Sequence, residues 1–459
     1  MITDQLIDVG MSLLKRIESL GDFEAYIVGG VPRDVVRGEE SDDVDIATNC
    51  PMEILEKNFR THNIGQSKKF GLITILHQKK SFEVAQFRSD GKYSDGRRPD
   101  NIKIVRNFED DAARRDFTIN SLGMNSKGDI LDYCNGIPDI TSKLVRTVGD
   151  PSERFQEDHL RMMRAARFAA MDGFSIEKET RKVIRRLFRL INKVTPERIH
   201  GELVKAASKP GPQFAKFILI LDDLKLLYQI LPEVHAMKYF RHDLNHHPEG
   251  PTVLDHSVEC LRAMNDEPYL SKLAALFHDT GKCVSFQEDK YGWKMAYHRH
   301  ERYSEPMVEE ICNRLKFSSF DKDAMMFAAK NHMKFHEMLK MKPSKIARLI
   351  SHVHFDTLLD VAKADEFSRG EKFMHRGEFD RVIEKIYEIK DRWESRVINS
   401  YLNLVSGDRI MELTGLKPGP DVGTIKRSVE DRIMDERLDP ADLSLVDEII
   451  LLEAKNQIS

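Results

Sequence analysis

A glycine pair followed by a proline and an arginine lies near the start of the chain, and these residue types suit the binding of phosphates. Gly29 and Gly30 let the backbone come close to a triphosphate because they carry no side chain. Pro32 fits the first turn of a following helix, whose N-terminal amides attract anions. Arg33 adds a fixed positive charge. The segment therefore predicts a phosphate-binding turn at the start of a helix.

Two aspartates, Asp43 and Asp45, follow this turn at alternate positions. On a strand they would share a face, while Val44 would point to the other side. Such a pair can hold two Mg²⁺ ions, which would activate a hydroxyl and neutralise a departing pyrophosphate. Glu83, on another expected strand, is either a third carboxylate of this centre or a surface residue. Either motif alone is explained as well by an ordinary turn or a solvated acidic loop, but the two in this order favour metal-dependent nucleotide transfer.

The stretch from Glu157 to Phe168 predicts a helix with one apolar and one charged face. Asp158, Arg161 and Arg164 share the charged face because they are spaced three residues apart. A carboxylate with a guanidinium can complement the amino donor and ring-nitrogen acceptor that cytosine and adenine both present, whereas guanine and uracil offer the reverse pattern. The alternative is a surface salt bridge worth about 0.3 to 0.5 kcal/mol.

Histidines gather in the second half of the chain. Twelve of the seventeen lie between residues 235 and 354, a concentration that suggests metal ligation. The dyad His278-Asp279 follows an apolar run that predicts a buried helix, with His256 on an earlier helix and Asp365 on a later one. These four side chains offer nitrogen and oxygen ligands that can converge on a metal. The second dyad, His242-Asp243, lacks such surroundings.

The bulk composition is that of an ordinary soluble protein. A chain of 459 residues with 41% hydrophobic residues is long enough for about two to four domains with sizeable cores. No apolar stretch approaches a membrane span and the N-terminus lacks a signal-peptide pattern, so we expect a cytoplasmic protein without a membrane partner. Five scattered cysteines, none in a CxxC pair, predict reduced thiols. The sequence leaves the oligomeric state open.

The elements that must position these residues fall into two parts. Up to about residue 135, short β-like runs alternate with helical stretches and turn signals, which predicts a small α+β domain. From about residue 153 the periodicity is helical, and the rest should be almost all helix. Residues 151–210 carry fourteen Lys and Arg against eight Asp and Glu, although the net charge of the chain is −4. A basic helical stripe there could follow an RNA backbone, and a solvated helix face explains it equally well.

The motifs of the first 205 residues resemble those of class II tRNA nucleotidyltransferases, the CCA-adding enzymes, and of the related bacterial poly(A) polymerases. They are GGVPRD with DVDIAT, KKFGLITI, FRSDGKYSDGRRPD, EDDAARRDFTINSLGMN, EDHLRMMRAARFAA and TPERIHGEL. The resemblance implies an α+β fold with a polymerase-β-like head and a small β-sheet, followed by an all-α neck, an HD domain and a tail. The implied boundaries are 1–145 for the head, 146–235 for a neck with nucleotide-selecting and RNA-binding helices, 236–385 for the HD phosphohydrolase-like domain and 386–459 for the helical tail.

The same resemblance implies a role for each matching residue. Asp43 and Asp45 would bind metal, and Asp158 with Arg161 would select the base in place of a nucleic-acid template. The implied catalytic residues are Asp43, Asp45 and, on its strand position, Glu83. The implied nucleotide-binding residues are Gly29, Gly30, Arg33, Arg115, Asp158, Arg161, Arg164 and Arg167.

The histidine-rich part resembles the HD phosphohydrolase domain. The implied metal ligands are His256, His278, Asp279 and Asp365, with His300 and His332 as additional candidates and a transition metal as a candidate occupant. In such domains an activated water attacks a phosphate ester. In bacterial CCA-adding enzymes the domain is associated with 2′,3′-cyclic phosphodiesterase, 2′-nucleotidase and phosphatase activities. The alternative is a metal-free, structural helical domain.

The sequence therefore predicts an enzyme that adds C, C and A to tRNA 3′ ends from CTP and ATP with Mg²⁺, together with a second, metal-dependent phosphohydrolase activity. The nearest alternative uses ATP alone, as a poly(A) polymerase or A-adding enzyme. The loop Arg88–Arg98 favours CCA addition over CC-only addition, because the matching family loop supports the switch from C to A addition. It also weighs against poly(A) synthesis, because poly(A) polymerases tend to differ in this loop. Two further alternatives are an HD phosphohydrolase with a non-catalytic N-terminal domain and a protein that only binds RNA.

Overall fold

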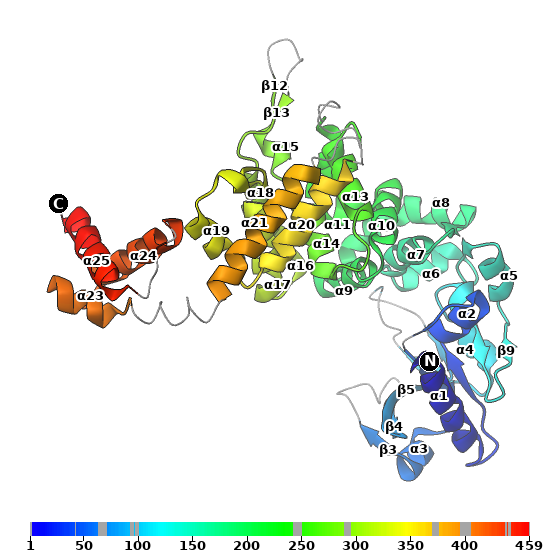
Figure 1. Ribbon diagram of the computed structural model, residues 1–459. Coiled ribbons are helices and arrows are strands. Elements are labelled where there is room, and N and C mark those ends of the chain that lie inside the picture. The colour runs from blue at the N-terminus through cyan, green and yellow to red at the C-terminus, as the bar shows by residue number, and fades with distance from the viewer. Residues whose placement is uncertain are drawn as a thin grey trace. The chain divides into compact units, whose positions relative to one another are not determined.

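The computed structural model describes residues 2–41, 43–62, 71–91, 96, 101–241, 250–288, 295–369, 376–394, 405–436, 438 and 442–458. The chain divides into two compact units, one of residues 1–235 with 314–316 and one of residues 236–313 with 317–459. In Figure 1 the strands of the first unit are blue and cyan, and the second unit runs from green to red. The division into four domains expected from the sequence stays a prediction.

A seven-stranded mixed sheet organises the first unit. Its order is β3-β4-β5-β2-β1-β8-β9, in which only the β2–β5 pair is parallel among the described strands. The sheet strands are β1 (Ala25–Val28), β2 (Asp45–Thr48), β3 (Arg60–His62), β4 (Leu72–His77), β5 (Lys80–Gln86), β8 (Gly123–Met124) and β9 (Ile130–Leu131), and β6 (Arg88–Asp90) pairs separately with β7 (Ile102–Ile104). The short β-like runs of the sequence include residues 26–28, 71–76 and 82–85, which fall on β1, β4 and β5.

The larger apolar core of this part lies on the face of the sheet where α1 packs, and a smaller cluster that includes Val28, Ala47 and Phe108 lies on the other face. Leu13 and Ile17 of α1 are fully buried against Ile27 of β1 and Ile46 of β2. Because side chains alternate along a strand, Asp45 faces away from this core. The helices around the sheet are α1 (Ile2–Glu18), α2 (Gly30–Arg37), α3 (Met52–Asn58), α4 (Phe108–Ala113) and α5 (Gly136–Thr141).

The remainder of the first unit is helical except for the short parallel pair β10 (Leu144–Val145) and β11 (Ser175–Ile176). The helices are α6 (Pro151–Glu157), α7 (Arg161–Ala169), α8 (Lys178–Leu187), α9 (Pro196–Ala207), α10 (Gly211–Asp223), α11 (Leu227–Ile230) and α12 (Pro232–Ala236).

The expectation of one continuous helix from Glu157 to Phe168 was wrong. Helix α6 ends at Glu157, Asp158 is extended with φ −140° and ψ 107°, and α7 begins at Arg161. The Asp158 carboxylate accepts a hydrogen bond from the Leu160 amide at 3.1 Å. A short acidic side chain that bonds a nearby amide in this way competes with the helical pattern, which explains the break.

In the second unit, α14 packs against α13, α17 and α20. Leu273–Phe277 of α14 are fully buried, so the buried helix expected there is confirmed. The helices are α13 (Val253–Arg262), α14 (Tyr269–Phe277), α15 (Lys282–Ser285), α16 (Glu301–Leu315), α17 (Ser319–Asn331), α18 (Lys334–Glu337), α19 (Pro343–Ile350), α20 (Phe355–Ser368) and α21 (Arg376–Glu394), with a small hairpin of β12 (Gln287–Glu288) and β13 (Met295–Ala296).

The described residues from 405 onward form three further helices: α23 (Gly407–Thr414), α24 (Pro420–Asp435) and α25 (Leu443–Ile458). Helix α23 ends at Thr414, because Gly415 takes the left-handed conformation with φ +71°. These helices bury their own apolar cluster, which includes Ile410, Ile425 and Ile450. No helix among the described residues is both long and apolar enough to cross a membrane.

Candidate functional site

The glycine turn lies directly against the acidic strand. Val28, the last residue of β1, pairs with Asp45, the first residue of β2. Gly29 follows in the left-handed region with φ +77°, and a Cβ there would lie 3.0 Å from Oδ2 of Asp45. Both the conformation and this close approach require glycine. Helix α2 begins at the next residue, Gly30, so the expected order of turn, helix start and carboxylate is present.

Three carboxylates influence one another at this edge of the sheet. Asp45 is aligned with Glu83 in the parallel β2–β5 pairing, and the exposed Asp43 lies just before β2 rather than within it. Burial, followed by the negative charges of Asp43 and Glu83, raises the pKa of Asp45 to about 6. A divalent cation would relieve this repulsion, and carboxylate oxygens are the ligands that Mg²⁺ prefers. The residues present therefore fit the metal that the sequence implies.

A cavity of about 390 Å³ opens beside these residues. Its lining contains, of the residues expected in the site, Gly29, Gly30, Arg33, Asp45, Arg115, Asp158, Arg161 and Arg164, and in addition Arg114, Asp116, Asn120 and Phe168. Three expected residues, Asp43, Glu83 and Arg167, are not in its lining. The cavity thus brings together residues that are more than 130 positions apart in the sequence.

The cationic wall of this cavity is held in place by buried acids. Arg33 donates to Asp34 through Nε and Nη2, both at 2.9 Å, and to Asn120 through Nη1 at 2.9 Å. Arg115 pairs with the fully buried Asp111 at 2.9 Å. Burial would raise the pKa of Asp111, but Arg115 and the neighbouring arginine outweigh it and hold that pKa below its usual value.

The two residues expected to select the base both lie at the cavity, but they bind other partners. Both oxygens of Asp158 accept from Arg198, at 3.0 and 2.7 Å, and Arg161 pairs with Glu157. The sequence reasoning missed Arg198, although it lies in the TPERIHGEL motif. Because each carboxylate oxygen can accept two hydrogen bonds, Arg198 orients Asp158 without exhausting its acceptor capacity.

A further buried acid near the residues expected to select the base is Glu202, which the sequence reasoning also missed. Its carboxylate pairs with Arg167 at 2.7 Å and with Arg164 at 3.5 Å. Both guanidinium groups also lie over the ring of Phe168, at 5.4 Å for Arg164 and 4.4 Å for Arg167. Arg33 approaches the same ring at 5.3 Å. Arg167 therefore shares both Glu202 and the Phe168 ring with Arg164, although Arg167 itself does not line the cavity.

The second candidate site is a cluster of buried histidines and aspartates in the second unit. Nε2 of His256 lies 3.2 Å from Asp365 and 3.6 Å from Asp279, and Nε2 of His278 lies 3.4 Å from Asp279. Donor atoms of His256, His278 and Asp365 lie within 4.8 Å of one another, together with the thiol of Cys260. The four residues expected from the sequence thus converge, and Cys260 is a fifth that the sequence reasoning missed.

The two additional histidines expected at this site lie on its far side. Nε2 of His300 is 3.0 Å from Oδ1 of Asp279, and Nε2 of His332 is 3.6 Å from the same oxygen. The two Nε2 atoms are 2.9 Å apart. Asp279 therefore lies between two groups of nitrogen ligands, one on each of its oxygens.

Backbone carbonyl groups decide which nitrogen each ring presents. Nδ1 of His278, His300 and His332 lies 2.7, 3.0 and 2.8 Å from a carbonyl oxygen, respectively. Each Nδ1 must therefore carry the proton, which leaves the Nε2 lone pair facing Asp279. Two such lone pairs close together need a proton or a cation between them. This donor set fits the metal that the sequence implies.

The pKa shifts within the cluster of histidines and aspartates are those expected of metal ligands. Burial and the nearby His278 lower the pKa of His332 to about 3, which keeps its ring neutral. Burial would raise the pKa of Asp279, but His278, Lys282 and His300 together hold it well below its usual value. The neutral ring of His332 and the ionised carboxylate of Asp279 are in the protonation states that ligate metals. The other dyad, His242-Asp243, lies outside the described residues, as do residues 92–95 and 97–98 of the loop Arg88–Arg98.

Comparisons with known proteins match both units. Residues 25–146 match the model of the poly A polymerase head domain, residues 173–238 that of the probable RNA and SrmB-binding site of polymerase A, and residues 252–370 that of the HD domain. The fold and the two sites thus define a polymerase-type nucleotidyltransferase head followed by RNA-binding helices and an HD domain. The chain is therefore similar to tRNA nucleotidyltransferases and poly(A) polymerases in its head and RNA-binding regions, and to HD domains in its second unit.

Curated relatives match over part of the chain. The CCA-adding enzyme of Lactobacillus gasseri is 42% identical over 219 residues, which are 48% of this chain and 54% of that enzyme. The CCA-adding enzyme of Enterococcus faecalis is 43% identical over 194 residues, which are 42% of this chain and 47% of that enzyme. The chain spans about half the length of the curated relatives it matches.

Solved structures share the fold over nearly the whole chain. The Bacillus stearothermophilus CCA-adding enzyme in complex with CTP has a TM-score of 0.62 at 20% identity and covers 98% of both chains. The Thermotoga maritima CCA-adding enzyme complexed with tRNA has a TM-score of 0.59 at 17% identity, covering 96% of this chain and 94% of that one. The expected fold class, an α+β head with helical domains after it, is confirmed.

Glu202→Ala should destabilise the first unit, because it leaves the guanidinium groups of Arg164 and Arg167 without their shared buried partner. Removing one partner of a buried ion pair costs about 3 kcal/mol or more. Urea denaturation followed by circular dichroism measures the loss. The control is Glu179→Ala, whose exposed pair with Lys182 should be worth less than about 0.5 kcal/mol. Equal losses of stability in the two variants would contradict the role of Glu202 as the shared buried partner of Arg164 and Arg167.

Asp45→Asn should leave the metal-free melting temperature unchanged or raise it, because it removes one of three mutually repelling carboxylates. The rise in melting temperature on adding Mg²⁺ should be smaller in this variant than in the wild type. Differential scanning calorimetry with and without Mg²⁺ measures both effects. Asp22→Asn, at an exposed aspartate, is the matched control and should keep the full Mg²⁺ response.

Proposed function

We propose that the first unit adds C, C and A to the 3′ end of tRNA, using CTP and ATP and releasing pyrophosphate. The 3′-hydroxyl oxygen would attack the α-phosphorus of the nucleotide, forming a phosphodiester as the bond to pyrophosphate breaks. The observation that carries the proposal is the cavity in which Asp45 and the glycine turn meet Asp158 and Arg161. The names of the relatives and of the solved structures support it. The cytoplasm is the proposed location of this reaction.

Asp43, Asp45 and Glu83 are the proposed ligands of two Mg²⁺ ions. When bound, these ions would supply the positive charge that activates the hydroxyl and neutralises the pyrophosphate. The backbone amides after Gly29 would meet the triphosphate at the start of α2. Arg115, already fixed by Asp111, would add charge without losing further side-chain freedom.

Asp158 and Arg161 are the proposed replacements for a template. The carboxylate would accept from the exocyclic amino group of cytosine or adenine, and the guanidinium would donate to the adjacent ring nitrogen. Arg198 would hold the carboxylate at the angle this requires. Arg164 and Arg167, both tied to Glu202, are proposed as further nucleotide contacts.

The second unit is the proposed site of a phosphohydrolase that acts on phosphate esters such as 2′,3′-cyclic phosphates. Water would add to phosphorus and one P–O ester bond would break, leaving a monoester and a free hydroxyl. His256, His278, Asp279 and Asp365, with His300 and His332, would hold one or two transition-metal ions that supply the charge for this step. Because Asp279 offers one oxygen to each group of histidines, it is the proposed bridging ligand.

Two other functions remain as alternatives. A poly(A) polymerase or A-adding enzyme would use the same centre with ATP alone. A phosphohydrolase with a non-catalytic N-terminal unit would not explain why Asp45 lies beside two other acids. Burial and the negative charges of those acids both act against the ionised form of Asp45.

Nucleotide incorporation separates these functions. Protein with Mg²⁺ and a tRNA lacking its 3′ CCA is given each labelled nucleoside triphosphate alone, and CTP with ATP. We expect two C additions from CTP and one further A when ATP is present. Incorporation of A alone would assign the protein to the polyadenylating or A-adding branch, and no incorporation at all would leave only the phosphohydrolase.

The two centres should be separable by mutation, because their carboxylates lie in different units. Asp43→Ala should abolish nucleotide addition and leave hydrolysis of a 2′,3′-cyclic nucleotide intact. Asp279→Ala should do the reverse. Circular dichroism checks that each variant is folded. Loss of both activities in one folded variant would disprove the division into two centres.

A further inference from the structure

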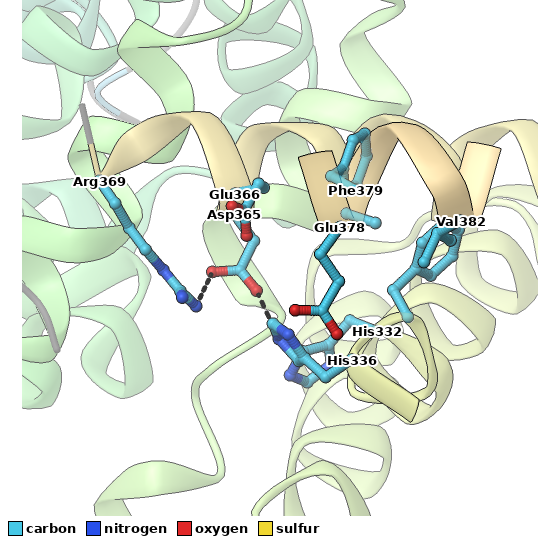
Figure 2. A pocket seen from close by; sticks show the side chains of 10 residues that line it. His332, His336, Asp365, Glu366, Arg369, Glu378, Phe379 and Val382 are labelled. Atoms are coloured by element: carbon cyan, nitrogen blue, oxygen red, sulfur yellow. Dashed lines mark ion pairs between the residues drawn. The ribbon is translucent and has the colours of Figure 1, made fainter. Parts of the chain in front are cut away.

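A cavity of about 300 Å³ adjoins the histidine–aspartate cluster of the second unit. Its floor is formed by His332 and Asp365, which belong to the cluster, and by the neighbouring His336. Figure 2 shows Arg369 and His336 reaching Asp365 from opposite sides. A ligand in this cavity would therefore touch the proposed metal centre.

Arg369 has the chemistry of an anion-binding residue. Its described partner is Asp365, at 3.7 Å from Nη2, which is too long for a hydrogen bond. Its Nε is buried and donates no hydrogen bond within the described part of the chain. A guanidinium presents five donors in a fixed fork, and a phosphate accepts them well. Arg369 is thus placed to hold a phosphate at the edge of the metal cluster.

The opposite wall is apolar and comes from outside the matched HD domain. That match ends at residue 370, whereas Phe379 and Val382 lie on α21, which begins at residue 376. Phe335 joins them, with its ring 6.5 Å from that of Phe379 and at 21° to it. Hydrolysis of a phosphate alone needs no aromatic wall. A substrate that carries a flat ring gains affinity from one, because a nucleobase stacks on aromatic side chains.

Helix α21 is fixed against the HD domain and so can act as a permanent wall. Lys385 on this helix donates to the carbonyl oxygens of Met338, Leu339 and Met341 at 3.2, 2.9 and 3.1 Å. Val382 and the residues one turn further along α21 lie in the same buried cluster as Phe335. The apolar wall is therefore held at a set distance from Asp365.

We propose that this cavity binds a nucleoside phosphate, with the phosphate between the metal cluster and Arg369 and the base against Phe335 and Phe379. Its volume lies at the small end of the range of about 300 to 1,000 Å³ usual for ligand pockets, which suits one nucleotide. Figure 2 shows the Glu378 carboxylate pointing toward His332 and His336. There it can accept a hydrogen bond from a sugar hydroxyl. Because its negative charge repels a phosphate, the phosphate would lie on the Arg369 side of the cavity. The inference rests on the proposed phosphohydrolase function and adds the residues that would choose its substrate.

Calorimetric binding to the Mn²⁺-loaded protein tests the assignment, with adenosine 2′-monophosphate and inorganic phosphate as probes. A parallel titration of the Asp279→Ala protein measures what the first unit binds, and that signal is subtracted. Phe379→Leu should weaken binding of the nucleotide by about fivefold to tenfold and leave phosphate binding unchanged. Arg369→Gln should weaken both. Tyr387→Leu, which changes an exposed aromatic residue on the same helix, is the control and should alter neither.

The outcomes separate this inference from the function on which it rests. If Asp279→Ala abolishes hydrolysis but Phe379→Leu leaves nucleotide affinity unchanged, the cavity assignment is wrong and the phosphohydrolase stands. If Asp279→Ala leaves hydrolysis intact, the phosphohydrolase assignment itself fails. Competition by a short RNA with a terminal 2′-phosphate would show that the nucleotide belongs to an RNA end. Competition by the mononucleotide alone would identify a free nucleotide, and either result supports the site.

Discussion

The pairing of β2 with β1 on one side and with β5 on the other sets the geometry of the N-terminal centre. This register aligns Val28 with Asp45 and Asp45 with Glu83. A slip of one residue would turn Asp45 toward the core and Ile46 out of it. The fully buried Ile46 therefore keeps the acidic residues in place, although burial and mutual repulsion act against the charge on Asp45. Apolar packing on one face of the sheet positions charged chemistry on the other.

The second centre is organised by the ends of helices. His278 follows α14 and His332 follows α17, and each Nδ1 bonds the carbonyl group three residues earlier in the chain. Carbonyl groups in the last turn of a helix lack a helical partner and can accept such bonds. The helix ends thus orient the rings before any metal is present. Because Asp279 directly follows His278 in the chain, its carboxylate lies between the rings of His278 and His332.

Elements that depend on a local sequence pattern could be predicted, whereas residues whose role depends on distant contacts could not. The strands around Ile27 and Ile75 were predictable because alternating apolar residues leave a clear signal, and the buried helix before His278 was predictable from its apolar run. Arg198 and Cys260 were missed because nothing in their neighbourhood shows which residue they face. The break at Asp158 was also missed, since it depends on that side chain bonding the Leu160 amide and Arg198.

The family motifs added what periodicity could not, because they linked Asp45 to Asp158 before any contact between distant segments was known. They said nothing about α21, whose residues lie beyond the matched HD domain. Its apolar wall emerges only when Phe379 is placed against Phe335.

The ion pairs of the first unit fall into two classes that respond differently to ionic strength. Those of Arg164 and Arg167 with Glu202 are largely buried, whereas Arg181 and Arg185 on α8 are about half exposed, at 50% and 44%. Dissolved salt screens exposed charges strongly and buried pairs weakly. Rising ionic strength should therefore weaken the binding of a polyanion to α8 well before it disturbs the arginines around the cavity beside Asp45. Binding of a long polyanion and the shape of the proposed nucleotide site would thus depend differently on dissolved salt.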